Sequence, residues 1–331
     1  MAIRIGAGSS GVYIYVLYHT QILNLTGVNR LMSKTHFPLF IIAGMPRGGT
    51  TFLYHNLNKH PWIFLPFRKE VNFFNVKYHL GVEWYNNLFN ERKNDQVCGD
   101  ISPPYFLDTE SIRRIKAYNP GVKMIISVRD PVEYALSFYS QFHSFKFKMP
   151  CFKDFLNGYG YTKSKKTLWV KFKDNYIIDT LELFMKEFDQ NVLLFDFSYL
   201  KKDSLMVLQA IERFIGVPAF FHQGNYDDEK INASDRKNVK FLSNLLHQEW
   251  LISFIHKVFP RKMTLFFRSR FDKASVQKVS TATVKRPYTD DDIKFAESEL
   301  AEQRVRVKKL FEKSPLIYGL KNEIIDCNYP V

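Results

Sequence analysis

The chain has 331 residues, of which 46% are hydrophobic, and its formal net charge is +14. This composition can bury a substantial core, in one large α/β domain or in two small ones. The charge favours acidic partners, such as phosphate cofactors, anionic glycans, nucleic acid or a membrane surface, without choosing among them. Cys98, Cys151 and Cys327 lie far apart, which excludes a cysteine-rich metal module, and we interpret them as reduced thiols.

The N-terminal residues 1–36 are expected to form a helical extension ahead of a single domain over residues 37–331. Residues 11–25 are moderately apolar, but Tyr13 and His19 interrupt the run and no clear signal-peptide cleavage site follows. The apolar run is also too short to span a bilayer. We therefore interpret it as an interfacial or packed helix.

Residues 39–53 predict a buried strand, a glycine-rich turn and the start of a helix. Residues 39–43 are apolar without alternation, which is typical of a parallel strand covered on both faces. The turn residues that combine backbone freedom with first-turn hydroxyls are Gly44, Gly48, Gly49, Thr50 and Thr51. Such a turn aims several N–H groups and the positive helix end at one point, which predicts an anion site.

The turn nearly matches the nucleotide P-loop, G-x-x-x-x-G-K-[ST], between Gly44 and Thr51. Thr50 stands where the phosphate-binding lysine belongs, and the cation of the turn, Arg47, lies three residues upstream. A phosphate-bearing cofactor other than ATP or GTP is therefore favoured. The alternative is a glycine turn that only joins the strand to the helix.

The rest of the chain alternates predicted strands with predicted helices. Strands are expected over residues 63–65, 96–100, 123–128 and 192–197, and helices over 50–58, 82–88, 110–118, 132–145 and 204–215. This order predicts an α/β, P-loop-like three-layer fold, in which helices flank a central parallel sheet.

The C-terminal third is unusually basic. Residues 230–286 hold 13 Lys or Arg and 3 Asp or Glu, a net of +10 out of the total +14, together with many aromatic residues. Such a segment can cap a cleft for an acidic substrate, lie on an anionic membrane, or form an ordinary solvated face. We interpret it as an insertion or cap. A last, structural helix is predicted over residues 289–312, with an acidic first turn.

Arg129 follows the predicted strand 123–128, at the end where open α/β sheets bind ligands. Ser137 lies two turns into the next predicted helix. An arginine and a hydroxyl that converge from these elements can hold a second phosphate. In the alternative interpretation, Arg129 only pairs with Asp130 or Glu133 at the helix start.

Glu70 follows Lys69 just past a predicted strand. A glutamate in this place is a candidate general base for an acceptor hydroxyl or amine. Taken alone, the pair could equally be a solvated surface pair.

These segments, in this order, resemble the sulfotransferases that use 3′-phosphoadenosine 5′-phosphosulfate (PAPS). The matching segments are residues 44–51 (GMPRGGTT), 69–74 (KEVNFF) and 128–131 (VRDP), with Ser137. The likeness is closest to the heparan sulfate (glycan) branch and its bacterial relatives. It covers about residues 40–218 well and the C-terminal end loosely.

The resemblance implies a role for each segment. The implied cofactor-binding residues are Arg47, Gly48, Gly49, Thr50, Thr51, Arg129, Ser137 and Lys285. The loop would hold the 5′-phosphosulfate, and Arg47 would stabilise charge on the departing bisphosphate, PAP. Arg129 and Ser137 would bind the 3′-phosphate, and Glu70 would be the catalytic base. Transfer would be in line, without a metal.

Two departures from the glycan branch concern the acceptor side. Asn72 stands where those enzymes usually have histidine, and Asp100-Ile101-Ser102-Pro103 lacks the lysine of their acidic-Lys-Thr-Pro stretch. A heparan-type acceptor therefore stays open, and Asp100 is the alternative base. The cytosolic branch uses a histidine base; the histidines that could serve, though none lies in that branch's motif, are His55, His60, His79 and His143.

The predicted function is sulfuryl transfer from PAPS to a hydroxyl or amine of a glycan or other sizeable, acidic or sugar-containing acceptor. A non-catalytic relative that binds anionic glycan or membrane, and a P-loop kinase of a small molecule, are the alternatives. No nucleic-acid partner is expected, and peripheral membrane contact would run through residues 230–286. We expect a cytoplasmic, membrane-associated enzyme, or one of the Golgi lumen if the native chain carries an anchor.

Overall fold

The computed structural model describes residues 37–144, 150–158, 162–163, 166–167, 172, 175–228, 236–238, 276–278, 286–312 and 316–318. The predicted extension over residues 1–36, Lys285 and most of the basic segment 230–286 lie outside these residues. The chain divides into two compact units, Met1–Phe37 and Pro38–Val331, and the sheet and its helices belong to the second.

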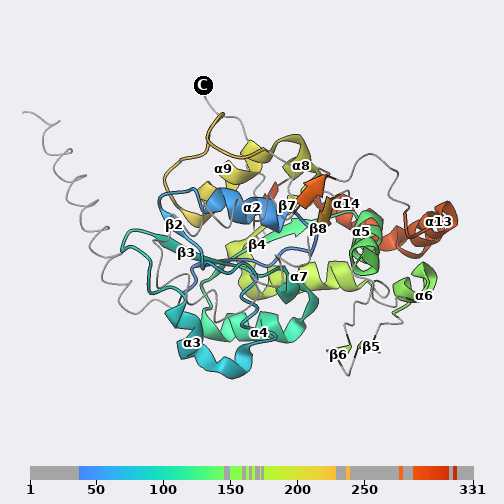
Figure 1. The fold of residues 1–331 in the computed structure, drawn as a ribbon, viewed down its shortest axis with the longest axis horizontal. Coiled ribbons are helices and arrows are strands. Elements are labelled where there is room, and N and C mark those ends of the chain that lie inside the picture. The colour runs from blue at the N-terminus through green and yellow to red at the C-terminus, as the bar shows by residue number, and fades with distance from the viewer. Residues whose placement is uncertain are drawn as a thin grey trace, which may run out of the picture. The chain divides into compact units, whose positions relative to one another are not determined.

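A six-stranded sheet forms the centre of this unit, with the strand order β10-β7-β4-β1-β3-β2 (Figure 1). The strands are β1 Phe40–Ile42, β2 Ile63–Phe64, β3 Val97–Ile101, β4 Lys123–Val128, β7 Val192–Asp196 and β10 Leu316–Tyr318. Strands β7, β4, β1, β3 and β2 are parallel, and β10 pairs with β7 antiparallel at the edge. The predicted parallel sheet is confirmed.

Helices cover both faces of the sheet. The α-helices are α2 Thr50–Leu57, α3 Gly81–Asn87, α4 Thr109–Tyr118, α5 Pro131–Ser144, α6 Phe152–Leu156, α7 Tyr176–Phe188, α8 Phe197–Lys202, α9 Ser204–Ile215, α13 Asp290–Glu299 and α14 Ala301–Leu310. The 3-10 helices are η1 Tyr78–Leu80, η2 Pro103–Leu107 and η3 Asp189–Asn191. Two short antiparallel pairs are β5 Thr162–Lys163 with β6 Lys166–Thr167, and β8 Arg236–Asn238 with β9 Val276–Lys278. Figure 1 shows α2 and α9 on one side of the sheet and α4 and α7 on the other, which confirms the three layers.

The core between the sheet and helices α2 and α9 explains the apolar run of β1. Phe40 and Ile42 are fully buried and pack with Leu53 of α2 and Ile211 of α9. The ring of Phe40 lies over Gly99 of β3, where an added Cβ would come within 2.1 Å of the ring. Apolar side chains fill this layer, so the polar residues that follow each strand collect at the strand ends.

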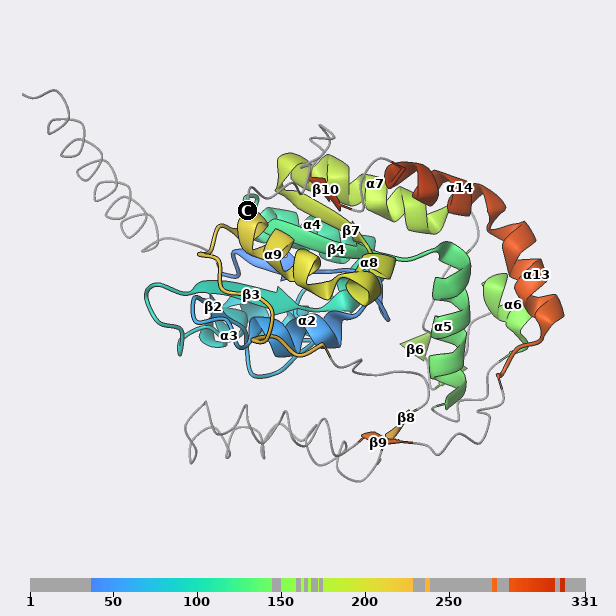
Figure 2. The same cartoon turned by 90° about the horizontal axis from the view of Figure 1, so that it is seen from above.

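The carboxyl ends of the five parallel strands meet at one edge of the sheet, where such folds bind ligands. In Figure 2 the arrows of β4 and β7 point toward α5 and α8, the helices that follow them. Across this edge lie, in order, the start of α8, Arg129 after β4, the loop 43–49 after β1, Ser102 after β3, and the loop 65–74 after β2. The topology thus places all the predicted motifs along one line.

The prediction of a single last helix is wrong. The helix ends at Glu299 and a new one starts at Ala301, because Leu300 leaves helical geometry with φ −105° and ψ 10°. Leu300 is fully buried, and the break lets α13 pack on α5 and α6 while α14 packs on α5 and α7. Helices α7 and α8 and strand β10 were not predicted. No helix in the described part of the chain is long and apolar enough to cross a membrane.

Candidate active site

The loop between β1 and α2 forms the centre of the candidate site. It is tied to β4, because the Met45 N–H donates to the Ser127 carbonyl at 3.2 Å. Two residues turn the chain in the left-handed region, Arg47 with φ 70° and Gly49 with φ 81°. In the described part of the chain, the N–H groups of Gly49, Thr50 and Thr51 have no acceptor. These donors at the positive end of α2 can therefore bind an anion.

Close packing explains the glycines of this loop. A Cβ on Gly48 would lie 2.7 Å from the Met45 carbonyl oxygen and 2.8 Å from Ser127 Oγ. A Cβ on Gly49 would lie 2.1 Å from Leu200 Cδ2. The loop is therefore held between the end of β4 and helix α8, and larger residues at either position would displace it.

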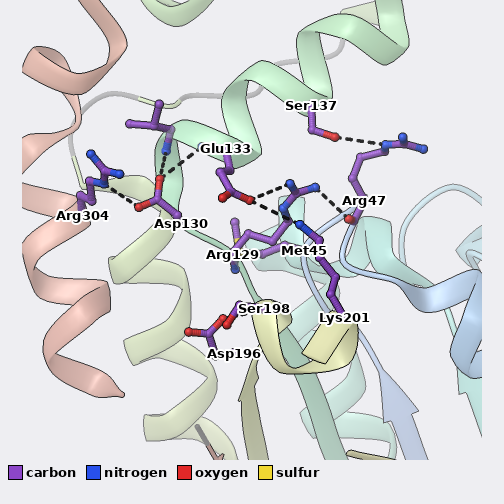
Figure 3. A network of polar contacts seen from close by, with 11 residues as sticks. Met45, Arg47, Arg129, Asp130, Glu133, Ser137, Asp196, Ser198, Lys201 and Arg304 are labelled. Carbon is purple, nitrogen blue, oxygen red and sulfur yellow. Dashed lines mark hydrogen bonds and ion pairs between the residues drawn. The ribbon is translucent and has the colours of Figure 1, made fainter. Parts of the chain in front are cut away.

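Arg129 links this loop to helices α5 and α8 (Figure 3). Its Nη1 donates to the Arg47 carbonyl oxygen at 3.1 Å, and its Nη2 donates to Glu133 Oε2 at 3.1 Å. The guanidinium lies 4.6 Å from the ring centroid of Phe197. The side chain is only 10% exposed, and its Nε is buried without an acceptor among the described residues. The alternative pairing with Glu133 is present, but it leaves one buried donor of Arg129 unused.

Arg47 and Ser137 meet beside this arginine (Figure 3). Arg47 Nε donates to Ser137 Oγ at 3.4 Å. Burial, and then the nearby charge of Arg129, lower the pKa of Arg47, although a guanidinium stays charged at neutral pH. Lys201 of α8 adds a third cation, with its Nζ 3.9 Å from Glu133 Oε2. The partner carboxylate, Glu133, is 57% exposed. This part of the edge suits a multiply charged anion.

Asp130 stabilises the start of α5, the helix that carries Glu133 and Ser137. Its Oδ1 accepts from the N–H groups of Val132 and Glu133 at 3.0 and 3.2 Å and so caps α5. Its Oδ2 lies 2.6 Å from Arg304 Nε of α14, and this bond raises the pKa of Arg304. The sequence reasoning missed Arg304, because no local pattern links it to Asp130, which lies 174 positions away.

Glu70 lies on the neighbouring loop after β2. Its N–H donates to the Ile101 carbonyl at 2.9 Å, and the backbone is left-handed, with φ 61° at Glu70 and 56° at Asn72. Lys69 Nζ is 2.6 Å from Glu70 Oε1; the Lys69 side chain is 13% exposed and that of Glu70 is 43% exposed. The carboxylate of Glu70 is thus reachable by a substrate, and a largely buried cation holds it.

Asp100, the alternative base, has a different environment. It is fully buried, and its carboxylate accepts hydrogen bonds from the hydroxyls of Ser102 at 2.7 Å and of Tyr85 and Tyr105 at 2.9 Å. Burial raises the pKa of Asp100, against the hydroxyl bonds that lower it. This enclosure argues against proton transfer with a substrate. Of the four candidate histidines, His60 is buried 3.2 Å from Glu212, His55 is half-buried, and His79 and His143 are exposed.

The structure therefore brings the predicted anion-binding residues together and sets Glu70 beside them. Residues Arg47, Gly48, Gly49, Thr50, Thr51, Arg129 and Ser137 gather over strands β4 and β1. Glu70 lies in the loop after β2, Asp100 lies near the end of β3, and Lys285 lies outside the described residues. Lys201 and Arg304 are charged residues of this region that the sequence did not predict. Among the described residues, no cluster of three or more His, Cys, Asp or Glu side chains could hold a metal ion, and metal-free chemistry stays a prediction.

Comparison with known proteins identifies the family. The model of the sulfotransferase domain matches residues 38–280. The chain belongs to this family. It is 30% identical over 181 residues to heparan sulfate glucosamine 3-O-sulfotransferase 3B1 of Mus musculus, covering 54% of this chain and 46% of that protein. It is 37% identical over 105 residues to the membrane-associated sulfotransferase kil1 of Dictyostelium discoideum, covering 31% and 22%.

The chain spans less than half the length of these curated relatives. Among solved structures, a sulfotransferase from Alicyclobacillus acidocaldarius aligns with a TM-score of 0.49 and 19% identity, over 67% of this chain and 97% of that one.

Proposed function

We propose that this sulfotransferase domain moves a sulfuryl group from PAPS to a hydroxyl or amine of a glycan or other sizeable, sugar-containing acceptor. The observation that carries the proposal is the set of unused donors at the sheet edge. Arg129 Nε is buried without an acceptor, next to a loop whose Gly49, Thr50 and Thr51 N–H groups also lack one. Buried donors are rarely left unpaired, so an anionic ligand completes this site. The family and its glycan-modifying relatives support sulfuryl transfer.

The donor set fits the two ends of PAPS, which supplies the activated sulfuryl group when bound. The loop N–H groups and Arg47 would hold the 5′ end, where Arg47 would stabilise negative charge on the leaving group. Arg129 and Ser137 would hold the 3′-phosphate. Thr50, in place of a P-loop lysine, favours this cofactor over ATP.

On the acceptor side, Glu70 would take the proton from the attacking hydroxyl or amine. Lys69, whose Nζ lies 2.6 Å from Glu70 Oε1, would fix the direction of that carboxylate. Asn72 Oδ1 is buried and has no partner in the described part of the chain, so it would accept a hydrogen bond from the acceptor. These roles explain why a glutamate with an exposed carboxylate lies beside a buried amide oxygen.

Binding calorimetry tests the cofactor assignment. We expect PAP to bind the wild type and to bind Arg129→Ala on the order of 10²-fold more weakly, because charged hydrogen bonds to a phosphate are lost. Binding of adenosine 5′-monophosphate, which lacks the 3′-phosphate, should change little. Arg113→Ala, at a side chain that is 73% exposed, is the control. Equal losses for both nucleotides, or magnesium-dependent ATP binding without PAP binding, would refute the assignment.

Turnover tests the enzymatic part. Incubation with PAPS and a panel of heparan-type and other sugar acceptors should produce a product with the added mass of one sulfate, detected by mass spectrometry. Tight PAP binding with no product from any acceptor would instead indicate a non-catalytic relative.

A further inference from the structure

Asp100 lies at the centre of a fully buried polar cluster beneath the loop that carries Glu70. Three hydroxyls donate to its carboxylate, Ser102 to Oδ1 at 2.7 Å, and Tyr85 and Tyr105 to Oδ2 at 2.9 Å each. All four residues of the cluster are fully buried: Asp100, Ser102, Tyr85 and Tyr105. Among the described residues, no cation contacts this carboxylate. A buried carboxylate without a cation is costly to desolvate, so the cluster needs an explanation beyond packing.

Two of these hydroxyls also reach the Glu70 loop. Ser102 Oγ accepts from the Asn72 N–H at 3.1 Å, and Tyr105 Oη accepts from the Phe73 N–H at 2.9 Å. Tyr105 Oη also accepts from the Phe74 N–H at 3.4 Å. The Ser102 hydroxyl therefore relays one hydrogen bond from the loop backbone to Asp100, and the Tyr105 hydroxyl relays two. Because a hydroxyl that accepts from an N–H must donate elsewhere to be satisfied, the carboxylate fixes the direction of both relays.

The loop needs such restraint. Glu70 and Asn72 both have left-handed backbones, with φ 61° and 56°, which non-glycine residues adopt at a cost. Only surroundings that over-determine the conformation keep such residues in place. The Glu70 N–H bond to the Ile101 carbonyl supports one side of the loop, and the two relays support the other.

We propose that Asp100 is a positioning residue for Glu70 rather than an alternative base. Its carboxylate, through Ser102 and Tyr105, fixes the backbone at Asn72 and Phe73 and so sets the direction of the Glu70 side chain. The inference depends on the proposed function only for what Glu70 does once it is in place.

Tyr85 supplies a matched control for Tyr105. Both tyrosines are fully buried, and both donate to Asp100 Oδ2 at 2.9 Å. Only Tyr105 accepts from a loop N–H; Tyr85 instead stacks its ring on Phe73 with centroids 4.4 Å apart, a contact that phenylalanine keeps. Tyr105→Phe therefore removes a relay, whereas Tyr85→Phe removes only a bond to Asp100.

The experiment compares these variants in the full chain by steady-state kinetics and by amide hydrogen exchange. We expect Tyr105→Phe to lower kcat by on the order of 10²-fold, the usual cost of a misplaced catalytic group, while the KM for PAPS holds. The Phe73 amide should exchange faster in this variant. Tyr85→Phe should keep most of the kcat and a slow Phe73 amide.

Asp100→Asn and Ser102→Ala extend the test if Tyr105→Phe folds poorly. Asp100→Asn replaces one of the two carboxylate oxygens with an NH₂ donor, so it must reverse the relay through Ser102 on Oδ1 or the one through Tyr105 on Oδ2. Ser102→Ala deletes the relay from Asn72. Both should lower kcat without weakening PAP binding. Equal kcat losses for Tyr105→Phe and Tyr85→Phe, or unchanged kcat and exchange in all variants, would overturn the inference. If no variant and no wild type turns over, the proposed function fails, while the exchange comparison still decides whether Asp100 positions the loop.

Discussion

The two halves of the ligand-binding edge are built in opposite ways. Over β7, β4 and β1, several donors have no acceptor among the described residues, such as Arg129 Nε and the N–H groups of Gly49 and Thr50. Over β3 and β2, the polar groups are closed on themselves around Asp100. The first half thus keeps donors available for the anion proposed above, whereas in the second half the polar groups of the described residues satisfy one another beneath Glu70.

This difference fits the roles proposed for the two halves. A cofactor supplies its own charges, so the protein gains by leaving donors free for them, each worth about 1.5–3 kcal/mol when a charged group is bonded. A general base must instead point in one direction, which requires rigid support beneath it. The comparison predicts that substitutions in the two halves separate binding from turnover.

The largest difference between the effect on turnover and the effect on PAP binding is expected for Glu70→Gln. Loss of the base should lower kcat by about 10²–10⁴-fold, the usual contribution of a positioned proton acceptor. Affinity for PAP in calorimetry should stay at the wild-type value, because Glu70 lies outside the anion-binding half. Glu110→Gln, at a carboxylate that is 50% exposed, is the matched control and should retain activity. Retained turnover in Glu70→Gln would move the base to another group.

Gly49→Ala should damage the other half. The new Cβ would clash with Leu200 Cδ2 at 2.1 Å, and the alanine backbone would have to adopt a φ of 81°. Overpacking and the left-handed backbone together should lower the free energy of unfolding by about 2–4 kcal/mol, measured by urea denaturation, and should weaken PAP binding. Gly121→Ala, where the nearest atom to an added Cβ lies 3.7 Å away, is the control. Equal effects of the two substitutions would show that the loop tolerates displacement.

The anion-binding half could be predicted because its elements are local in the sequence. The strand, the glycine turn and the helix start of residues 39–57 follow one another, and the apolar run and the glycines each have a direct physical reading. Arg129 could be placed because a parallel strand has to end at the shared edge. Its contact with Phe197 could not be predicted, because Phe197 belongs to α8, a helix too short to show a hydrophobic period in the sequence.

The supporting residues could not be predicted, because burial is a tertiary property. Asp100 was a candidate base because it stands in the stretch that corresponds to the acidic-Lys-Thr-Pro segment of the glycan branch, and its enclosure by Tyr85, Tyr105 and Ser102 is the observation behind the positioning role proposed for it. Arg304 of α14 bonds Asp130 after the helix break at Leu300, whereas the apolar period of the sequence runs through that residue without interruption. Pairs that lie this far apart leave no trace in a single sequence.

A pH titration of stability tests the closed half. Burial raises the pKa of Asp100 in the folded state above its unfolded value of about 3.9. The stabilisation linked to this proton is therefore fully present below about pH 4 and is lost as the pH rises through the folded pKa. The free energy of unfolding of the wild type minus that of Asp100→Asn should be largest near pH 4 and fall toward pH 7, by about 1.4 kcal/mol per unit of pKa rise. Asp95→Asn, at an exposed position, gives the baseline, and a difference that grows with pH would contradict the prediction.

The smallest effect is expected at Glu133, the carboxylate that Arg129 and Lys201 share at 3.1 and 3.9 Å. In the anion-binding half this charge competes with a phosphate for the same two cations, so Glu133→Gln should tighten PAP binding. The pair is largely exposed on the Glu133 side, so we expect only about 0.2–1 kcal/mol, up to about fivefold in Kd, and less at high salt. Glu182→Gln, whose side chain is 59% exposed and pairs with Arg306, is the control. Weaker binding in Glu133→Gln would mean that Glu133 holds Arg129 in its binding direction, and the unused donors of this half would then depend on an acidic support just as Glu70 does.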